Sequence, residues 1–187
     1  MSELHIPALS LVVLVGVSGS GKSTFAERAF GPFEVVSSDF CRALVSGNEN
    51  DQSASADAFD VLHHIVGKRL DRGLLTVVDA TSVSKESRAG LVKLAREHDV
   101  LPVAIVLDVP TEIAVRRNAS RPDRSFGPGP VRRQAGQLRK SIRGLGREGF
   151  PRRPRAVEPG GGRRRDRRPR PAAHRPQRPA RALRHHR

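Results

Sequence analysis

The sequence predicts an α/β domain of three layers, in which helices cover both faces of a mainly parallel sheet. Short apolar runs at 11–15, 74–79 and 102–107 are typical of buried strands. The segments between them have helical patterns, and this alternation favours parallel strands, which need helical crossovers. In addition, a glycine-rich turn at 16–23 joins the first strand to the first helix.

That turn reads GVSGSGKS and fits the phosphate-binding pattern G-x-x-x-x-G-K-[ST]. Only glycine lets the backbone turn tightly enough to aim several N–H groups at one anion, and the following helix adds its positive N-terminus. Lys22 can reach the outer phosphates of a nucleotide, Ser23 can ligate magnesium, and Thr24 is available to an inner phosphate. The predicted nucleotide-binding residues are Gly16, Ser18, Gly19, Ser20, Gly21, Lys22, Ser23 and Thr24.

A second candidate group follows the next predicted strand, at 34–36. The first helix is expected to close before it, with Gly31 as a left-handed C-cap. Ligands bind at the carboxyl ends of parallel strands, so we expect Asp39 beside the glycine-rich turn. On a helical turn Asp39 and Arg42 share a face, where the carboxylate could accept a hydroxyl proton and the arginine could hold an anion. Alternatively, Ser38 or Asp39 caps a helix and Arg42 is solvated.

A helix predicted at 54–72 should bury one apolar stripe and stop at Gly73. The stripe consists of Phe59, Leu62, Val66 and Leu70. The next strand ends at Asp79, which either orients magnesium through water or caps the following helix at 85–97. After the last apolar run, a further helix is expected with Thr111 as its cap.

Four arginines cluster before a Gly-Pro-Gly-Pro break at 127–130, ahead of a last helix predicted at 131–143. Arginines on a hinged segment near a nucleotide could close over its phosphates and neutralise charge as a group moves. A solvated charge run is the alternative reading. The four residues are Arg116, Arg117, Arg121 and Arg124.

The formal net charge of +15 is divided unevenly, because residues 151–187 carry +12 and the rest of the chain only +3. The single cysteine, Cys41, excludes an internal disulfide and suits a reducing compartment, so we expect a cytoplasmic protein. The apolar run at 8–17 is too short to span a membrane. Without Trp or Tyr there is no obvious platform for stacking bases, so any nucleic acid is expected to be held by its phosphates.

Taken together, six motifs resemble the N-terminal kinase module of bacterial polynucleotide kinase-phosphatases, over about residues 4 to 150. They are GVSGSGKSTF at 16–25, SSDFCR at 37–42, NDQSA at 50–54, TVVDAT at 76–81, RNASRPDR at 117–124 and GLGREGF at 144–150. The resemblance implies a P-loop kinase fold with a helical arginine lid. It also implies transfer of the γ-phosphate of ATP, or another NTP, with Mg²⁺, to a 5′-OH end of RNA or DNA.

By the same resemblance, Asp39 is the general base and Arg42 binds the phosphate next to the acceptor hydroxyl. Arg117 is the lid arginine at the transferring phosphate, with Gln52 to orient it, and Arg121 and Arg124 are lid contacts to the nucleotide. Ser82 stands where the family would have Asn. The family joins this module to a metallophosphatase and a ligase-like domain, and neither lies within these 187 residues.

After Phe150, Pro and Arg dominate, and such a segment cannot bury enough apolar surface to order itself. We interpret 1–150 as the 5′-kinase domain and 151–187 as a disordered tail translated out of frame. The codons for 182–187 together with the stop codon after them can be chosen so that reading one nucleotide later gives Pro-Phe-Asp-Ile-Ile-Gly-Asp, the expected start of the metallophosphatase. The same shift can turn 159–166 into an acidic sequence like the family's link. The last strand of the family's sheet would then be missing; a selected basic tail that binds nucleic acid is the alternative.

Two other functions stay open at the level of sequence. The glycine-rich turn and Asp39 would serve any hydroxyl acceptor, as in a kinase for a small metabolite. A non-catalytic reading is an ATP-binding or inert product whose arginine tail binds RNA. A signalling GTPase is disfavoured because the sequence has no N-K-x-D motif.

Overall fold

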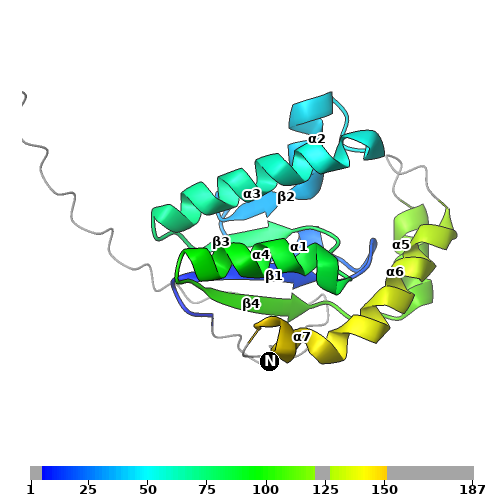
Figure 1. Cartoon of the computed structure of the whole chain (residues 1–187). Helices are drawn as coiled ribbons and strands as arrows, with labels where there is room; N and C mark the ends of the chain where they lie inside the picture. The colour runs from blue at the N-terminus through cyan, green and yellow to red at the C-terminus, as the bar shows by residue number, and fades with distance from the viewer. Residues whose placement is uncertain (1–5, 121–126, 151–187) are drawn as a thin grey trace, which may run out of the picture.

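The computed structural model of the protein describes residues 6–120 and 127–150. Strands and helices alternate as predicted (Figure 1). The strands are β1 (Ser10–Val15), β2 (Val35–Ser37), β3 (Thr76–Asp79) and β4 (Leu101–Val106). The helices are α1 (Lys22–Ala29), α2 (Ser38–Ser46), α3 (Ser55–Asp71), α4 (Lys85–Glu97), α5 (Thr111–Ala119), α6 (Pro128–Ser141) and α7 (Leu145–Glu148), with 3₁₀ turns η1 (Gln52–Ala54) and η2 (Ile142–Gly144).

The sheet is wholly parallel, with the strand order β2-β3-β1-β4. β1 pairs along its whole length with β4, and every one of its residues is buried. Its side chains alternate between two cores, as expected for a strand with both faces covered. Leu11, Val13 and Val15 belong to one core, whereas Val12 and Leu14 belong to the other.

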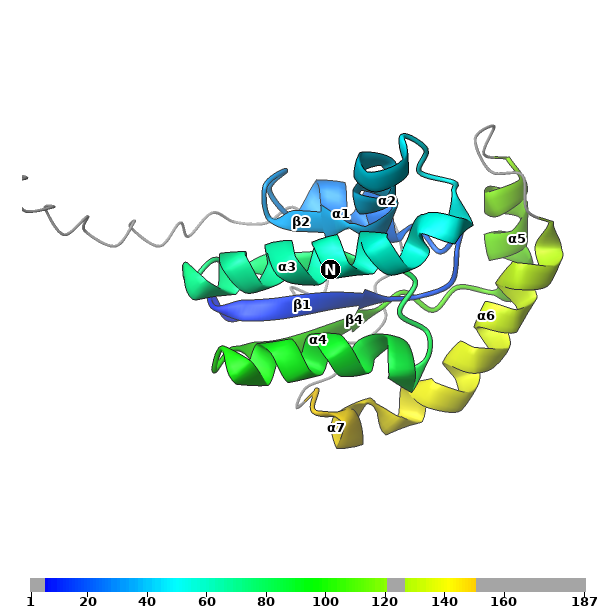
Figure 2. The same cartoon turned by 45° about the horizontal axis from the view of Figure 1, so that its top comes forward.

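These two cores define the three layers of the fold. The larger core packs α3 and α4 onto one face of the sheet, and α6 and α7 join it through Leu138 and Leu145. On the opposite face, α1 contributes Ala26 to the smaller core, and its C-cap residue, Phe30, packs there too. Figure 2 shows α3 and α4 lying side by side over the strands. The predicted α/β three-layer fold with a parallel sheet is therefore confirmed.

Within the described part of the chain, no strand pairs with the outer edge of β4. The family strand expected after Phe150 would fall at 151–187, outside the described residues. Phe150 itself is buried in the larger core.

The carboxyl ends of the strands form the functional end of the molecule, because the first three lead directly into polar segments. β1 leads into the glycine-rich turn, β2 into α2, and β3 ends at Asp79. The pair α5 and α6 stands beyond these strand ends (Figure 1).

Several predicted boundaries are wrong at helix ends. Gly31 is not a left-handed C-cap: α1 ends at Ala29, and Phe30 caps it in an extended conformation. The Glu34 carboxylate accepts the Gly31 N–H at 2.8 Å, which satisfies that donor without a left-handed turn. Thr111 is the first residue of α5 rather than its cap, a place that Pro110 takes.

Two further corrections concern α6 and α3. The segment at 127–130 is not a break, because α6 begins at Pro128, and proline suits the first helical turn. In α3 the buried stripe is Ala58, Leu62, Val66 and Leu70. Phe59, expected in that stripe, is only partly buried at its edge.

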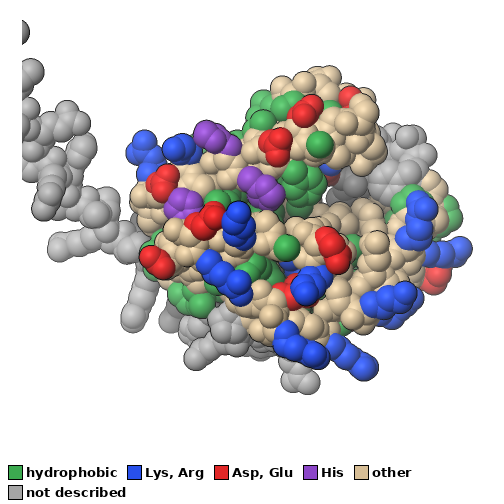
Figure 3. Space-filling view, in the orientation of Figure 1, with side chains coloured by type: hydrophobic (Ala, Val, Ile, Leu, Met, Phe, Trp, Pro, Cys, Tyr) green, Lys and Arg blue, Asp and Glu red, His purple; other side chains and the backbone are tan. Residues whose placement is uncertain are grey.

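Positive side chains gather over α5, α6 and α7 at the rim of the molecule (Figure 3). The exposed cations of this C-terminal part are Arg116, Arg117, Arg132, Arg133, Arg139, Lys140, Arg143 and Arg147. Glu112, the exposed acid of α5, lies 3.6 Å from Arg132. Among the described helices, none is long and apolar enough to cross a membrane.

Candidate nucleotide and acceptor site

The glycine-rich turn folds as a tight loop because several of its positions have no room for a side chain. Gly19 and Gly21 have φ values of +80° and +90°, in the left-handed region that favours glycine. A Cβ atom on Gly19 would lie 2.2 Å from the Ala114 carbonyl oxygen of α5. A Cβ atom on Gly16 would lie 2.9 Å from the Leu107 carbonyl oxygen. The loop backbone is thus wedged between α5 and the segment after β4.

Lys22 is the first residue of α1, and it is 8% exposed. Its Nζ donates to the carbonyl oxygens of Gly16 and Val17, each at 3.0 Å. The N-cap, Gly21, has no side chain to accept from the first helical N–H groups. A helix N-terminus without a side-chain cap, next to a fixed ammonium group, is suited to an anion.

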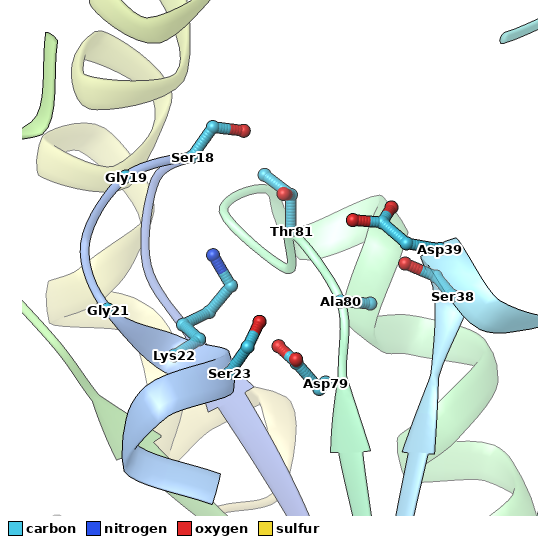
Figure 4. A pocket seen from close by; sticks show the side chains of 10 residues that line it. All are labelled: Ser18, Gly19, Gly21, Lys22, Ser23, Ser38, Asp39, Asp79, Ala80 and Thr81. Carbon is cyan, nitrogen blue, oxygen red and sulfur yellow. The ribbon is translucent and has the colours of Figure 1, made fainter. Parts of the chain in front are cut away.

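One pocket collects the loop and the ends of β2 and β3 (Figure 4). Its lining residues are Ser18, Gly19, Gly21, Lys22, Ser23, Ser38, Asp39, Asp79, Ala80 and Thr81. Lys22 and Asp39 approach it from opposite sides, and the Ser23 hydroxyl and the Asp79 carboxylate point toward one another. The structure therefore brings Asp39 to the same pocket as five of the predicted loop residues.

Asp39 is held by a buried arginine. Arg42 Nη1 lies 2.8 Å from Asp39 Oδ1 and also donates to the Glu49 carbonyl oxygen at 2.8 Å. The side chain of Arg42 is 7% exposed and that of Asp39 is 32% exposed. Asp39 and Arg42 share a helix face at i, i+3 as predicted, but there they pair with one another, and Arg42 is neither solvated nor part of the pocket lining. Ser37, not Ser38 or Asp39, caps α2 by accepting from the Phe40 N–H at 3.4 Å.

Asp79 does not cap the helix that follows it. Ser84 is the N-cap of α4, in a reciprocal capping box with Ser87. This leaves the Asp79 carboxylate facing Ser23 inside the pocket. A hydroxyl and a carboxylate are hard oxygen donors that fit Mg²⁺, which usually takes one or two protein ligands and completes its shell with water and phosphate. Among the described residues, no group of three His, Cys, Asp or Glu is arranged for a metal ion.

The other predicted residues are distributed more widely. Gly16 and Ser20 are buried within the loop, whereas Thr24 is exposed on α1 and does not line the pocket. Arg117 is exposed on α5. No hydrogen bond joins it to Gln52 in the described part of the chain, where the Gln52 amide lies 3.5 Å from the Asn50 carbonyl oxygen. Arg121 and Arg124 lie outside the described residues.

Sequence reasoning left out four residues that contact the site. Ser38, Ala80 and Thr81 line the pocket, and their closeness to Asp39 and Asp79 in the sequence was the available signal. Gln134 of α6 accepts a hydrogen bond from the Ser18 N–H at 2.8 Å. It is 116 residues away from Ser18, and no local pattern indicates this contact.

A parallel sheet with a glycine-rich loop between β1 and α1, and a lysine at the start of that helix, defines the nucleotide-binding P-loop kinase fold. The chain belongs to the AAA domain family, whose model matches residues 11–145.

Solved structures share this fold at low identity. A chain in the Pnkp1/Rnl/Hen1 RNA repair complex is 21% identical, with a TM-score of 0.62, over 74% of this chain and 47% of that chain. A chain in another Pnkp1/Rnl/Hen1 complex is 24% identical, with a TM-score of 0.50, over 65% of this chain and 43% of that chain. A candidate kinase from Chloroflexus aurantiacus is 19% identical, with a TM-score of 0.54, over 70% of this chain and 76% of that chain.

The chain thus spans less than half the length of the two RNA repair chains that it matches. No curated protein sequence matches it.

Proposed function

We propose that this protein is a magnesium-dependent kinase that transfers the γ-phosphate of ATP, or another NTP, to the 5′-OH end of RNA or DNA. The observation that carries the proposal is the pocket in which Asp39 faces Lys22 from the opposite side. Lys22 and the loop N–H groups suit a triphosphate, and a carboxylate across the pocket suits a hydroxyl acceptor. The similarity in fold to a chain of an RNA repair complex supports a nucleic-acid end as that acceptor.

In the proposed reaction, the 5′-oxygen forms a bond to the γ-phosphorus, while the bond from that phosphorus to the β–γ bridging oxygen breaks. ADP leaves, and the 5′-OH proton passes to the Asp39 carboxylate. Arg42 fixes the orientation of that carboxylate through the 2.8 Å contact. Ser23 and Asp79 are the residues that would hold Mg²⁺, which neutralises phosphate charge when bound.

The remaining roles are proposals that rest on the resemblance. Arg42 is proposed to contact the phosphate next to the acceptor hydroxyl, and because its side chain is 7% exposed and does not line the pocket, that contact requires it to turn away from Asp39. Arg117, Arg121 and Arg124 are proposed to contact the nucleotide, with Gln52 orienting Arg117.

The test is transfer of labelled γ-phosphate from ATP to a 5′-OH oligonucleotide, to the same oligonucleotide with a 5′-phosphate, and to nucleosides and sugars. We expect transfer to the 5′-OH oligonucleotide alone. Asp39→Asn should lower the rate by roughly 10²- to 10⁴-fold, because it removes a proton acceptor. Lys22→Ala should abolish transfer, because the outer phosphates lose the charge that orients and neutralises them.

Two matched controls change the same residue types on the exposed surface of α3, namely Asp57→Asn and Lys68→Ala. Both should retain the full rate. Preferred transfer to a sugar or a nucleoside would replace the proposal by a small-metabolite kinase. If the Asp39→Asn variant transfers phosphate as fast as the unaltered chain, Asp39 is not the proton acceptor, and the proposed acceptor site is wrong.

A further inference from the structure

Gln134 connects helix α6 to the phosphate-binding loop. Its Oε1 accepts from the backbone N–H of Ser18 at 2.8 Å, and its side chain is half-buried. Ser18 is only 5% exposed, and a backbone N–H at such a position needs a hydrogen-bond partner. Gln134 supplies that partner.

The same peptide group also holds Lys22. The Val17 carbonyl, which shares a rigid plane with the Ser18 N–H, accepts from Lys22 Nζ at 3.0 Å and from the Ser20 N–H at 3.1 Å. In a trans peptide the N–H and the C=O point in opposite directions, so fixing one fixes the other. Gln134 therefore accepts a hydrogen bond from the N–H of this peptide group, while the C=O of the same group accepts one from Lys22.

If the hydrogen bond from Ser18 to Gln134 is lost, the loop has little room to compensate by moving toward α5. The next residue, Gly19, lies so close to the Ala114 carbonyl oxygen that even a Cβ atom would come within 2.2 Å of it. A rotation of the Val17–Ser18 peptide is an adjustment that this close approach does not block, and it would turn the Val17 carbonyl away from Lys22.

We propose that Gln134 is a positioning residue, which holds the Val17–Ser18 peptide so that Lys22 is presented to the outer phosphates of a nucleotide. The inference rests on the nucleotide site of the proposed function, but not on its acceptor. It predicts that the contribution of Gln134 to nucleotide affinity passes through Lys22.

The test measures dissociation constants of ATP, ADP and AMP, each with Mg²⁺, by titration calorimetry on the full chain. Gln134→Leu removes the acceptor at similar size, and Gln134→Met, which is closer in shape, is tested beside it. We expect ATP and ADP to bind about 5- to 10-fold more weakly, the loss of one hydrogen bond, with AMP nearly unchanged. Gln137→Leu is the matched control, because Gln137 is exposed one turn further along the same helix.

A double-mutant cycle with Lys22→Met separates positioning from a general structural role. In the Lys22→Met background, Gln134→Leu should change ATP affinity less than twofold. Equal losses for ATP and AMP, or additive losses in the cycle, would overturn the inference. So would tighter ATP binding by Gln134→Leu, since that would mean that Gln134 competes with phosphate for the Ser18 N–H.

The acceptor assignment can fail separately. Weakened ATP binding of the expected kind, in a protein that does not phosphorylate 5′-OH ends, would keep the role of Gln134 and refute the acceptor. Absence of ATP binding by the unaltered chain would overturn both.

Discussion

At the scale of single residues, Asp39 and Arg42 show how a buried side chain can fix the position of a catalytic group. The arginine is nearly inaccessible and donates from one nitrogen to the Asp39 carboxylate and to the Glu49 carbonyl oxygen. A buried guanidinium with fixed partners has few alternative rotamers, so it holds the carboxylate in one place. This is the kind of support that a proton acceptor needs, because its reach to the reacting hydroxyl is limited to hydrogen-bond distance.

His63 on α3 gives a residue-scale prediction about pH. Its Nε2 is buried without a hydrogen-bond partner among the described residues, and its ring lies 6.2 Å from that of Phe59. Burial lowers the pKa of His63, and the Asp60 carboxylate offsets this in part. As the pH falls below about 6.5, the unfolded chain takes up the proton before the folded one, so the free energy of unfolding should decrease.

The measurement is urea denaturation between pH 8 and pH 5. His63→Gln should remove part of the decrease below pH 6.5, whereas His64→Gln, on the exposed side of the same helix, should leave it as it is. If the two variants and the unaltered chain lose stability in parallel, His63 is not the group responsible.

The candidate site could be predicted from the sequence where spacing alone places a residue. The glycine-rich loop is contiguous, and Asp39 follows from its place after β2 in a parallel sheet. The burial of Arg42 could not be predicted, because it depends on how α2 packs against the rest of the fold. Gln134 could not be predicted either, since its contact joins residues far apart in the chain.

At the scale of elements, an ion pair between α4 and α7 connects the last helix of the described residues to the segment that lines the pocket. Arg88 is fully buried and binds both carboxylate oxygens of Glu148 at 2.7 Å. Its Nη1 also donates to the Ser82 carbonyl oxygen at 2.9 Å, next to Thr81 of the pocket. This contact gives the Glu148 of the GLGREGF motif a structural role.

Breaking this pair should be costly, because it leaves a carboxylate buried without its partner. Arg88→Met is expected to lower the free energy of unfolding by about 3–5 kcal/mol, and Arg88→Met combined with Glu148→Leu should recover much of the loss. Chemical denaturation measures both. Lys93→Met is the control, since it removes an exposed pair with Glu97. A loss from Arg88→Met no larger than that of the control would contradict the role given to the pair.

The elements themselves could largely be predicted, because apolar periodicity and crossover length determine which segments are strands and which are helices. Helix α4 lies at Lys85–Glu97, where the sequence places it. The exact ends of the helices could not be predicted, because they depend on contacts that the sequence does not show. Glu34 reaches Gly31 and removes the expected left-handed cap, and Pro128 starts α6 where a proline pair suggests an interruption.

At the scale of the whole molecule, the positive charge lies toward the C-terminal part of the chain. Exposed arginines and lysines cover α5 to α7, and most of the net charge falls in 151–187. We propose that 1–150 is the 5′-kinase domain and that 151–187 is read out of frame. In the family that the sequence resembles, this module is joined to a phosphatase and a ligase-like domain. We propose that the other reading frame encodes the start of that phosphatase.

This division predicts that three versions of the protein differ in defined ways: residues 1–150, the full chain, and a version with the other frame restored after codon 150. Residues 1–150 and the full chain should phosphorylate a 5′-OH oligonucleotide equally, because the pocket lies within 1–150. RNA binding by the full chain that falls steeply with salt, survives Asp39→Ala and vanishes when 151–187 are removed would instead favour the non-catalytic hypothesis, in which the arginine tail binds RNA by counterion release. The restored version should melt at a higher temperature, because a strand paired with β4 would satisfy the backbone groups of that edge.

Each outcome bears on a different part of the division. Loss of transfer in residues 1–150 alone would move the domain boundary into the tail. RNA affinity that persists without the tail would assign it to the cations of α5 to α7 instead. The gene's nucleotides decide the frame independently of any protein: an alternative frame after codon 150 that encodes no metallophosphatase would leave the basic segment as a selected tail.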